Sequence, residues 1–269
     1  MHLTYQHGHF MWHELITTDP GGAAAFYAHV VGWQTNSYYP AGSSTPYTTW
    51  LDERGPLGAL LSLDDEAHES GISPHWFANV MVWNLDVCLA RVIESGGKLL
   101  SGPEAMGTVG RWAAIQDPQG IKLAVFAAKD PLEARHPAKH GGVTWNELMS
   151  TNHRAAFEFY CSIFDWQVLR TVNPGASDEY IVYGAYDEPL GGMFTRPSDH
   201  PLPIGWVYYI QVSELEVARA RAEEQGAQIV TLAVEIPGRG RTAQIIDPQG
   251  ASVALREAVA REDPKDLVT

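Results

Sequence analysis

Apolar residues recur along the chain at two spacings, which together predict strands and helices in a fixed order. Residues 10–17 alternate as in a strand with one buried face. The next apolar residues follow the spacing of a buried helix face: Ala23, Phe26, Tyr27, Val30 and Val31. Asp19 can cap that helix, and Pro20 suits its first turn. Strand-like runs at 47–51 and 57–63 follow, so the pattern predicts a unit of one strand, one helix and three strands.

A second unit of the same kind is expected from Trp76. Residues 76–82 have the pattern of a strand, and a helix should begin near Asp86. This helix should end at Gly96-Gly97, because glycine commonly follows the last turn of a helix. The strands that follow should flank a tight turn, with the strands at 112–115 and 121–126 and the turn at Asp117-Pro118-Gln119-Gly120.

The whole pattern occurs twice, at a shift of 133 residues. Residues 12–34 match 145–167 at Trp12 and Trp145, Glu14 and Glu147, Phe26-Tyr27 and Phe159-Tyr160, and Trp33 and Trp166. The helix of the copy should begin after Asn152. Further on, Tyr47 meets Tyr180, and after a slip of three residues the matches are Trp76 with Trp206, Arg111 with Arg241, and 117–120 with 247–250. Shared periodicity alone cannot produce such matches, so the chain contains an internal duplication.

The duplication predicts two domains, at residues 1–130 and 141–258. The polar run 128–140, which contains two prolines, is the expected connection between them. The segment 259–269 lies beyond the last match and carries few apolar residues, so we expect a poorly packed tail.

Composition narrows the classes of partner. The 269 residues carry a net charge of -14 with a pI near 5.1, which argues against nucleic acid or an anionic membrane, because phosphate binding needs clustered Lys and Arg. Residues 1–9 are polar, and no run of about 18 apolar residues occurs. We therefore expect a cytoplasmic protein, monomeric or homodimeric. With only Cys88 and Cys161, a disulfide framework is excluded, and both residues should be buried, inert thiols.

A helix ending in Ala-Phe-Tyr-Ala-His-Val-Val-Gly-Trp, followed later by Asp-Pro-Gln-Gly before a final strand, resembles the vicinal oxygen chelate superfamily. That superfamily includes glyoxalase I, bleomycin- and fosfomycin-resistance proteins and extradiol dioxygenases. Both halves match, so the resemblance covers nearly the whole chain. It implies an α+β fold of two tandem glyoxalase-like domains, each made of two βαβββ units with curved mixed sheets whose concave faces form pockets. It says little about function, because one scaffold serves lyases, dioxygenases, epimerases and drug binders.

The resemblance also implies where a metal ion would be held, and those positions lack ligands here. Family enzymes use His or Gln near the start of the first strand of each unit and Glu on the last strand. The corresponding residues are Trp12, Phe77, Ala124, Trp145, Val207 and Ala254. The remaining ligand should come from 57–63 or 190–194, which hold no carboxylate or imidazole. Because a metal site needs several protein ligands of the right type, we predict that the usual metal site is lost and that the protein uses no cofactor.

Trp12 and Glu14 share one face of the first strand, and the family pattern makes that face the concave one. The copy preserves the pair as Trp145 and Glu147. A carboxylate beside indoles on a mainly apolar surface can anchor a ligand amine, hydroxyl or amide, or can act as a general base. The predicted ligand-binding residues are Trp12, Glu14, Phe77, Asn79, Arg111, Trp145, Glu147, Tyr209 and Arg241.

Two other interpretations of charged residues stay open. The paired glutamates could instead be bound by Arg111 and Arg241, or by backbone groups, and only hold the sheets together. The histidines at positions 7, 9 and 13 have a spacing that suggests a metal, but incidental surface histidines fit better, because they lie opposite Trp12 and Glu14 on an extended segment. His75 could lie at a pocket rim.

Three functions are compatible with these residues. The first is a glyoxalase/bleomycin-resistance-like protein that binds a small, largely apolar organic molecule in concave pockets, either sequestering it or acting on it without the usual metal. The second is a metal-dependent lyase or dioxygenase with displaced ligands such as Glu14, Glu147 and His75. The third is a regulatory or scaffolding protein with vestigial pockets. Metal content separates the second from the first, and ligand-dependent thermal stabilisation separates the first from the third.

Overall fold

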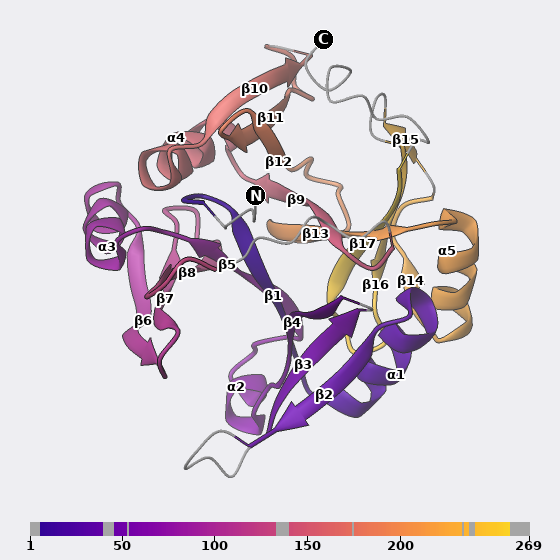
Figure 1. Ribbon diagram of the computed structural model, residues 1–269. Helices are drawn as coiled ribbons and strands as arrows, with labels where there is room; N and C mark the ends of the chain where they lie inside the picture. The colour runs from indigo at the N-terminus through magenta and orange to yellow at the C-terminus, as the bar shows by residue number, and fades with distance from the viewer. Residues whose placement is uncertain are drawn as a thin grey trace. The chain divides into compact units, whose positions relative to one another are not determined.

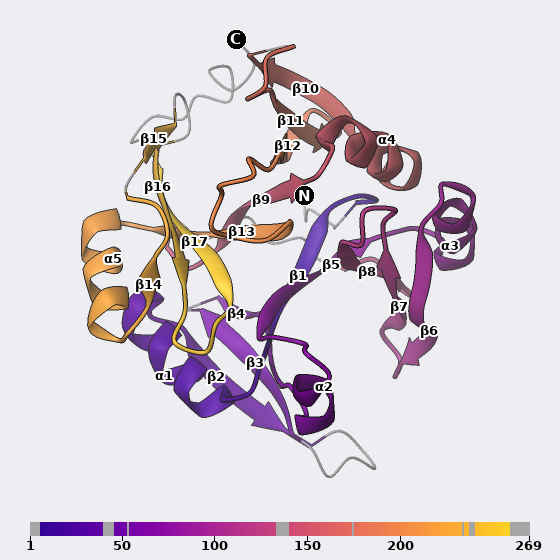
Figure 2. The same cartoon turned by 180° about the vertical axis from the view of Figure 1, so that it is seen from behind.

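In the computed structural model the chain has an α+β fold, with the repeated order of elements that the sequence predicts (Figures 1 and 2). It describes residues 6–39, 46–52, 54–132, 140–173, 175–232, 234–236 and 240–258. The predicted tail at 259–269 and most of the predicted connection, 133–139, lie outside the described residues.

The described residues of the first repeat form eight strands and three helices. Its elements are β1 (Phe10–Thr17), α1 (Pro20–Val31), β2 (Gln34–Tyr38), β3 (Tyr47–Asp52), β4 (Gly55–Ser62), α2 (Asp65–Glu69), β5 (His75–Met81), α3 (Leu85–Glu94), β6 (Lys98–Met106), β7 (Gly110–Gln116) and β8 (Lys122–Ala128). The second repeat has the same order without a counterpart of α2 among its described residues. Its elements are β9 (Val143–Ser150), α4 (His153–Phe164), β10 (Gln167–Val172), β11 (Tyr180–Ala185), β12 (Glu188–Thr195), β13 (Gly205–Val212), α5 (Leu215–Glu224), β14 (Gln228–Ile229), β15 (Val234–Ile236), β16 (Gly240–Ile246) and β17 (Ser252–Glu257).

The strands fall into four blocks of mixed sheet. Their orders are β2-β3-β4-β1, β5-β8-β7-β6, β10-β11-β12-β9 and β13-β17-β16-β14, with β15 also paired to β16. In each block the strand before the helix pairs in parallel with the last strand, as β1 does with β4 and β9 with β12. The other pairs are antiparallel. Each block therefore has the βαβββ topology that the sequence predicts.

The predicted helix ends are confirmed by their hydrogen bonds. The Asp19 carboxylate accepts from the backbone N–H of Gly22 at 2.9 Å, and Asn152 caps α4 through Ala155 at 3.1 Å. Gly96 and Gly226 follow α3 and α5 with φ of 84° and 91°, a backbone conformation that glycine adopts without strain. The prediction missed the single-turn helix α2, which is too short to show an apolar period.

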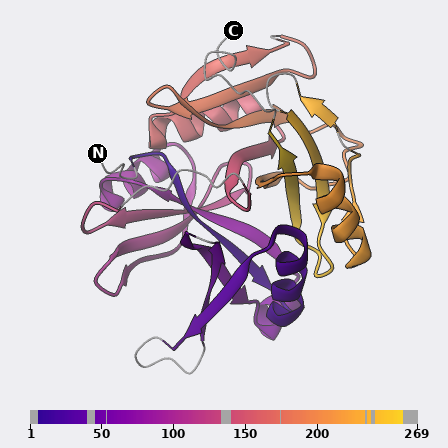
Figure 3. The ribbon, with the colours of Figure 1, turned by 45° about the vertical axis from the view of Figure 1, so that its right-hand side comes forward.

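Two compact units divide the chain differently from the two repeats. The first unit takes the described residues of 1–11, 77–136 and 145–206, and the second takes those of 12–76, 137–144 and 207–269. Each unit thus joins half of one repeat to half of the other. Helices α3 and α4 pack together in the first unit, and α1 and α5 in the second, where Figure 3 shows them side by side. The domain ends at 130 and 141 stay a prediction.

The two repeated motifs, Phe-Tyr and Asp-Pro-Gln-Gly, meet inside these units. In the second unit the Tyr27 hydroxyl donates to Asp247 at 3.0 Å, and in the first unit Tyr160 donates to Asp117 at 3.1 Å. Each aspartate also accepts two backbone N–H groups of its own turn. A helix of one repeat therefore binds the turn of the other repeat, twice, with both partners buried.

The prediction that both cysteines are buried is confirmed for Cys88 and is wrong for Cys161. Cys88 is buried, and burial raises the pKa of its thiol to about 12. Cys161 is half-buried, and burial raises its thiol pKa as well. Both thiols therefore stay protonated at neutral pH. Among the described helices, none is long and apolar enough to cross a membrane.

Candidate functional site

In the first repeat, Trp12, Glu14 and Tyr47 lie on the sheet face that points away from α1. Strand register aligns Glu14 with Ala59 of β4, and Ala59 with Thr49 of β3, so these residues share a face. Tyr47 is two residues from Thr49 and lies on that face too. Trp50 lies on the opposite face, where its ring contacts Tyr27 of α1 at 5.5 Å between centroids.

The three side chains form a polar cluster within this largely apolar face. The Trp12 indole N–H donates to the Tyr47 hydroxyl at 3.2 Å. Burial, and next the negative charge of Glu14, raise the pKa of Tyr47 well above its usual range. The phenol therefore stays protonated as a donor, close to a carboxylate that is only 8% exposed.

The second repeat contains the same three residue types in a matching cluster. The Trp145 indole N–H donates to the Tyr180 hydroxyl at 3.0 Å, and Tyr180 donates to Oε2 of Glu147 at 2.8 Å. Glu147 is 4% exposed. A chain of donors thus runs from indole to phenol to carboxylate, and it holds one carboxylate oxygen in a fixed place.

Glycine allows Tyr180 to reach Glu147 across the intervening strand. Gly192 of β12 is the register partner of Glu147, and a Cβ atom at this position would overlap the Tyr180 phenol. The ring of Tyr180 also stacks on Phe194 at 6.0 Å with 21° between the planes. In the first repeat, Ala59 occupies the position of Gly192, so the two clusters are similar but not identical in packing.

Asn79 and Tyr209 occupy matching positions in the second βαβββ block of each repeat. They are 4% and 3% exposed, and their register partners are Ala124 and Ala254, the positions at which family enzymes carry a glutamate. Gln244 donates to the Tyr209 hydroxyl at 3.4 Å. Phe77, two residues before Asn79 on β5, is half-buried on the same face. His75 lies at the start of β5, 2.8 Å from the Ser73 carbonyl oxygen.

Arg111 and Arg241 do not bind the strand glutamates. Arg111 makes two hydrogen bonds, of 2.9 and 3.0 Å, to Asp86 on α3, and Arg241 binds Glu216 on α5. The guanidinium groups are 45% and 40% exposed. Pairing of these arginines with Glu14 and Glu147, one of the interpretations drawn from the sequence, is therefore wrong. Each arginine thus joins a strand to the helix of its own block, β7 to α3 and β16 to α5.

The three N-terminal histidines have different partners. His7 lies 3.1 Å from the Ile163 carbonyl oxygen, His9 is 3.7 Å from Glu188, and the His13 ring packs on Tyr208 at 4.9 Å. Burial lowers the pKa of His7 and His9. Within the described residues, no group of three or more His, Cys, Asp or Glu side chains is placed to hold a metal ion.

Sequence reasoning missed Tyr47 and Tyr180 as members of the clusters. A signal for them existed, because the two tyrosines match in the repeat, but only the fold shows that they lie two strands from the glutamates. It also missed buried polar side chains on β13 and β17, Gln211 and Arg256, which are register partners. Arg256 donates to the Thr144 hydroxyl at 3.3 Å.

The clusters have a limited chemical repertoire. A buried carboxylate can accept a hydrogen bond from a ligand hydroxyl, amine or amide, or can take a proton from an acidic carbon or oxygen. The phenol and the indole orient the carboxylate and supply flat apolar surface for packing.

Comparison with known proteins agrees with the fold. A family model described as "Glyoxalase/Bleomycin resistance protein/Dioxygenase superfamily" matches residues 6–125 and again 142–255. A Mycobacterium tuberculosis protein named "Putative glyoxylase CFP32" is 28% identical over 247 residues, which cover 92% of this chain and 94% of that protein. "Anthracycline biosynthesis protein DnrV" of Streptomyces peucetius is 26% identical over 257 residues, covering 91% of this chain and 92% of that protein.

Solved structures with the same fold include enzymes. The Mn(II)-bound glyoxalase from Novosphingobium aromaticivorans superposes with a TM-score of 0.62 at 15% identity, covering 94% of this chain and 82% of that one. The 2,2',3-trihydroxybiphenyl 1,2-dioxygenase from Sphingomonas wittichii strain RW1 gives a TM-score of 0.64 at 11% identity, with 96% and 93% covered. At these identities the likeness concerns the fold. With two matched regions and four βαβββ blocks, this chain belongs to the glyoxalase/bleomycin resistance protein/dioxygenase superfamily and consists of two tandem glyoxalase-like domains.

Proposed function

We propose that this protein binds a small, largely apolar organic molecule on the sheet faces opposite its helices, with Glu14 and Glu147 as polar anchors, and that it does so without the metal ion used by enzymes of its family. The observation that carries the proposal is the cluster of tryptophan, tyrosine and glutamate that both repeats preserve. Burying a carboxylate among aromatic rings costs free energy, so its retention in both repeats supports a role for the carboxylate.

The donor set of these faces does not fit the family's metal. Trp12, Trp145 and Val207 stand at first-strand ligand positions, and Ala124 and Ala254 at last-strand positions, and none of these side chains offers a metal-binding oxygen or imidazole nitrogen. The alanines are fully buried in the strands. We therefore assign the polar contact with the ligand to Glu14 and Glu147.

Aromatic side chains around the anchors favour an aromatic ligand. Trp145, Tyr180 and the stacked Phe194 present flat surfaces near Glu147, and flat rings pack well on flat ligands. Two relatives are named as anthracycline biosynthesis proteins. Anthracyclines and simpler hydroxyanthraquinones, which pair fused rings with hydroxyl donors, are therefore the first compounds to test.

The test is a thermal-shift screen followed by calorimetric titration. A ligand at a hundredfold excess over its Kd should stabilise the folded protein by about 2.7 kcal/mol. Replacing either glutamate by glutamine, Glu14→Gln or Glu147→Gln, should weaken binding by about 1 to 3 kcal/mol, because a charge-assisted hydrogen bond is lost. Glu216→Gln, on the outer helix α5, is the matched control and should leave affinity unchanged.

Two results would count against the proposal. If no aromatic or apolar compound in the screen raises the melting temperature, the pockets are vestigial and the scaffolding function is favoured. If the glutamine variants keep full affinity but lose about 3 to 5 kcal/mol of folding stability, the glutamates are structural, because that is the cost of breaking a buried charge network.

A further inference from the structure

A buried carboxylate lies directly next to the tyrosine of the second cluster. Glu179 immediately precedes Tyr180, the first residue of β11. Glu179 is 4% exposed. Its carboxylate binds the start of α4 and the loop before β11, whereas the phenol of Tyr180 donates to Glu147 of β9.

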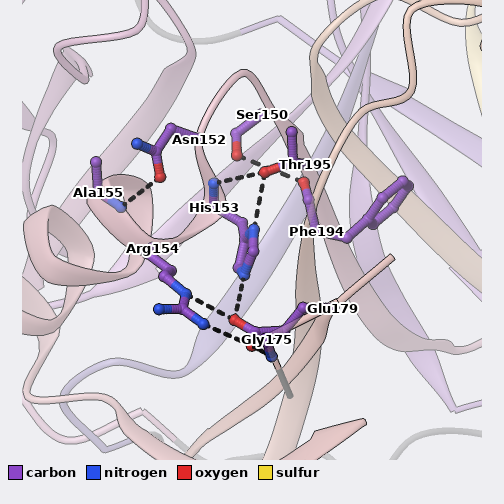
Figure 4. Close-up of polar contacts among 9 residues, drawn as sticks. All are labelled: Ser150, Asn152, His153, Arg154, Ala155, Gly175, Glu179, Phe194 and Thr195. Atoms are coloured by element: carbon purple, nitrogen blue, oxygen red, sulfur yellow. Dashed lines mark hydrogen bonds and ion pairs between the residues drawn. The ribbon is translucent and has the colours of Figure 1, made fainter. Parts of the chain in front are cut away.

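Three neighbouring groups donate hydrogen bonds to the Glu179 carboxylate (Figure 4). Arg154 binds both oxygens, with Nε 2.8 Å from Oε1 and Nη2 2.7 Å from Oε2. His153 Nε2 lies 2.9 Å from Oε1, and the backbone N–H of Gly175 donates to Oε2. Arg154 first, then Gly175 and His153, hold the pKa of Glu179 well below its usual range. The carboxylate is therefore ionised at neutral pH.

The same cluster connects three segments of the second repeat. His153 and Arg154 begin α4, Gly175 belongs to the loop before β11, and Glu179 ends that loop. The other ring nitrogen of His153, Nδ1, lies 2.8 Å from the hydroxyl of Thr195, the last residue of β12. Because Nε2 must donate to an ionised carboxylate, Nδ1 of a neutral ring accepts the Thr195 hydroxyl proton. The helix start and the loop are thus bound to one carboxylate, and His153 connects that carboxylate to the strand end.

We propose that Glu179, held by His153 and Arg154, is a positioning residue that fixes the hydrogen bond from Tyr180 to Glu147. We call Glu179, His153, Arg154 and Thr195 the clamp. Strand register pairs Tyr180 with Phe194, and Glu179 and Thr195 are the neighbours of this pair in the chain. A shift of β11 along β12 would break both hydrogen bonds between Glu179 and Arg154. The bidentate ion pair therefore opposes the movement that would carry the phenol away from Glu147.

The first repeat lacks this device. The residues that match His153, Arg154, Glu179 and Thr195 are Pro20, Gly21, Pro46 and Ser62. Neither proline nor glycine offers a side-chain donor or acceptor. Tyr47 should therefore be insensitive to changes in the clamp, which makes the first repeat an internal control for the second.

The experiment follows the tyrosine hydroxyls directly and needs no ligand. Protein labelled with ¹³C at the tyrosine Cζ atoms gives NMR signals that report hydrogen bonding of each phenol, and Tyr180→Phe, Tyr47→Phe and Glu147→Gln assign the signals of interest. In Glu179→Gln the Tyr180 signal should move in the same direction as in Glu147→Gln, while the Tyr47 signal stays in place. Glu216→Gln, which removes a carboxylate bound by Arg219 and Arg241 in α5, should move neither signal.

A second variant keeps the test decisive if Glu179→Gln does not fold. Arg154 is 63% exposed, so Arg154→Gln removes the ion pair from the solvent side, and Arg154→Lys, which keeps the charge but not the fork, should recover part of the wild-type Tyr180 signal. An unchanged Tyr180 signal in a folded Glu179 or Arg154 variant overturns the inference. Equal movement of the Tyr180 and Tyr47 signals also overturns it, because a general loosening of the fold would then be the cause.

The effect on ligand binding rests on the proposed function and is measured separately. If a dihydroxyanthraquinone binds the wild-type protein, Glu179→Gln should weaken that binding about tenfold, which corresponds to one lost hydrogen bond of about 1.4 kcal/mol. Absence of probe binding by the wild type would count against the proposed function alone, because the Tyr180 signal still decides the role of Glu179. Unchanged affinity with a moved Tyr180 signal would count against Tyr180 as part of the binding site.

Discussion

Replacing Tyr27 by phenylalanine should destabilise the protein more than the same replacement of Tyr160, although the two tyrosines match in the repeat. Both hydroxyls donate to a buried turn aspartate of the other repeat. Trp76 and Trp206 also match in the repeat. In the second compact unit, Trp76 Nε1 donates to the Tyr27 hydroxyl at 3.0 Å. The counterpart of that indole nitrogen, Trp206 Nε1, has no hydrogen-bond partner.

The magnitudes follow from these bonds. Removing a hydroxyl that donates to a buried carboxylate costs about 1 to 3 kcal/mol, so Tyr160→Phe should fall in that range. Tyr27→Phe additionally leaves the buried Trp76 N–H unsatisfied, so its cost should be about 1 kcal/mol greater. Tyr186→Phe is the control, because this side chain is 58% exposed and its change should stay within about 0.5 kcal/mol.

The assay is urea unfolding combined with native-state hydrogen exchange, because two compact units need not unfold as one. Exchange should accelerate in 240–246 and 252–257 for Tyr27→Phe and in 110–116 and 122–128 for Tyr160→Phe, since those strands flank the affected turns. Equal costs for the two variants, or a larger cost for Tyr160→Phe, would refute the hydrogen-bond accounting.

Three further predictions test other features. Protein purified in chelator-free buffer should contain no stoichiometric Zn, Fe, Ni or Mn by elemental analysis; near one equivalent per chain would favour the metal-dependent alternative. Asp247→Asn should lower stability at neutral pH by about 1 to 3 kcal/mol, because asparagine keeps only one of the two oxygens that accept the turn N–H groups and the Tyr27 hydroxyl. Burial raises the pKa of Asp247, so the stability that its proton contributes at low pH is lost as pH rises through the folded-state pKa, and the variant should lack this part of the pH dependence. An unchanged free energy of unfolding at pH 7 would contradict this. Gly192→Ala should cost about 1 to 3 kcal/mol by displacing Tyr180, while Ala59→Gly at the matching position should cost only about 0.5 to 1 kcal/mol; equal costs would show that the glycine is not needed for packing.

Much of the fold was predictable because local signals repeat. The apolar spacing of Ala23 to Val31, the caps at Asp19 and Asn152 and the Asp-Pro-Gln-Gly turns are each set by contacts within a few residues. The same reasoning could not find the compact units, because their defining bonds join residues as distant as Tyr27 and Asp247. Nothing in the periodicity of either segment shows which turn a given helix will contact.

The candidate site was predictable only where a residue is repeated and faces the right way. Trp12 and Glu14 were found because strand alternation places them on one face and the copy preserves both. Arg111 is repeated as well, but it binds Asp86 of α3 and not Glu14, so repetition alone does not show which polar groups contact each other. The Glu179 clamp gave no signal at all, because it occurs in one repeat and its side-chain bonds join residues 25 to 42 positions apart in the chain.

Repetition therefore has two physical meanings in this protein, and the direction in which a side chain points separates them. Tyr27 and Asp247 point into the helix side of the sheets and bind one repeat to the other, so they must be kept in both copies for the units to form. Glu14 and Glu147 point to the opposite face, where they lie beside the hydroxyls of Tyr47 and Tyr180. A residue of the first kind should reveal itself by a loss of stability, and one of the second kind by a loss of binding. Measuring both quantities for every repeated residue would therefore map the assembly and the site independently of each other.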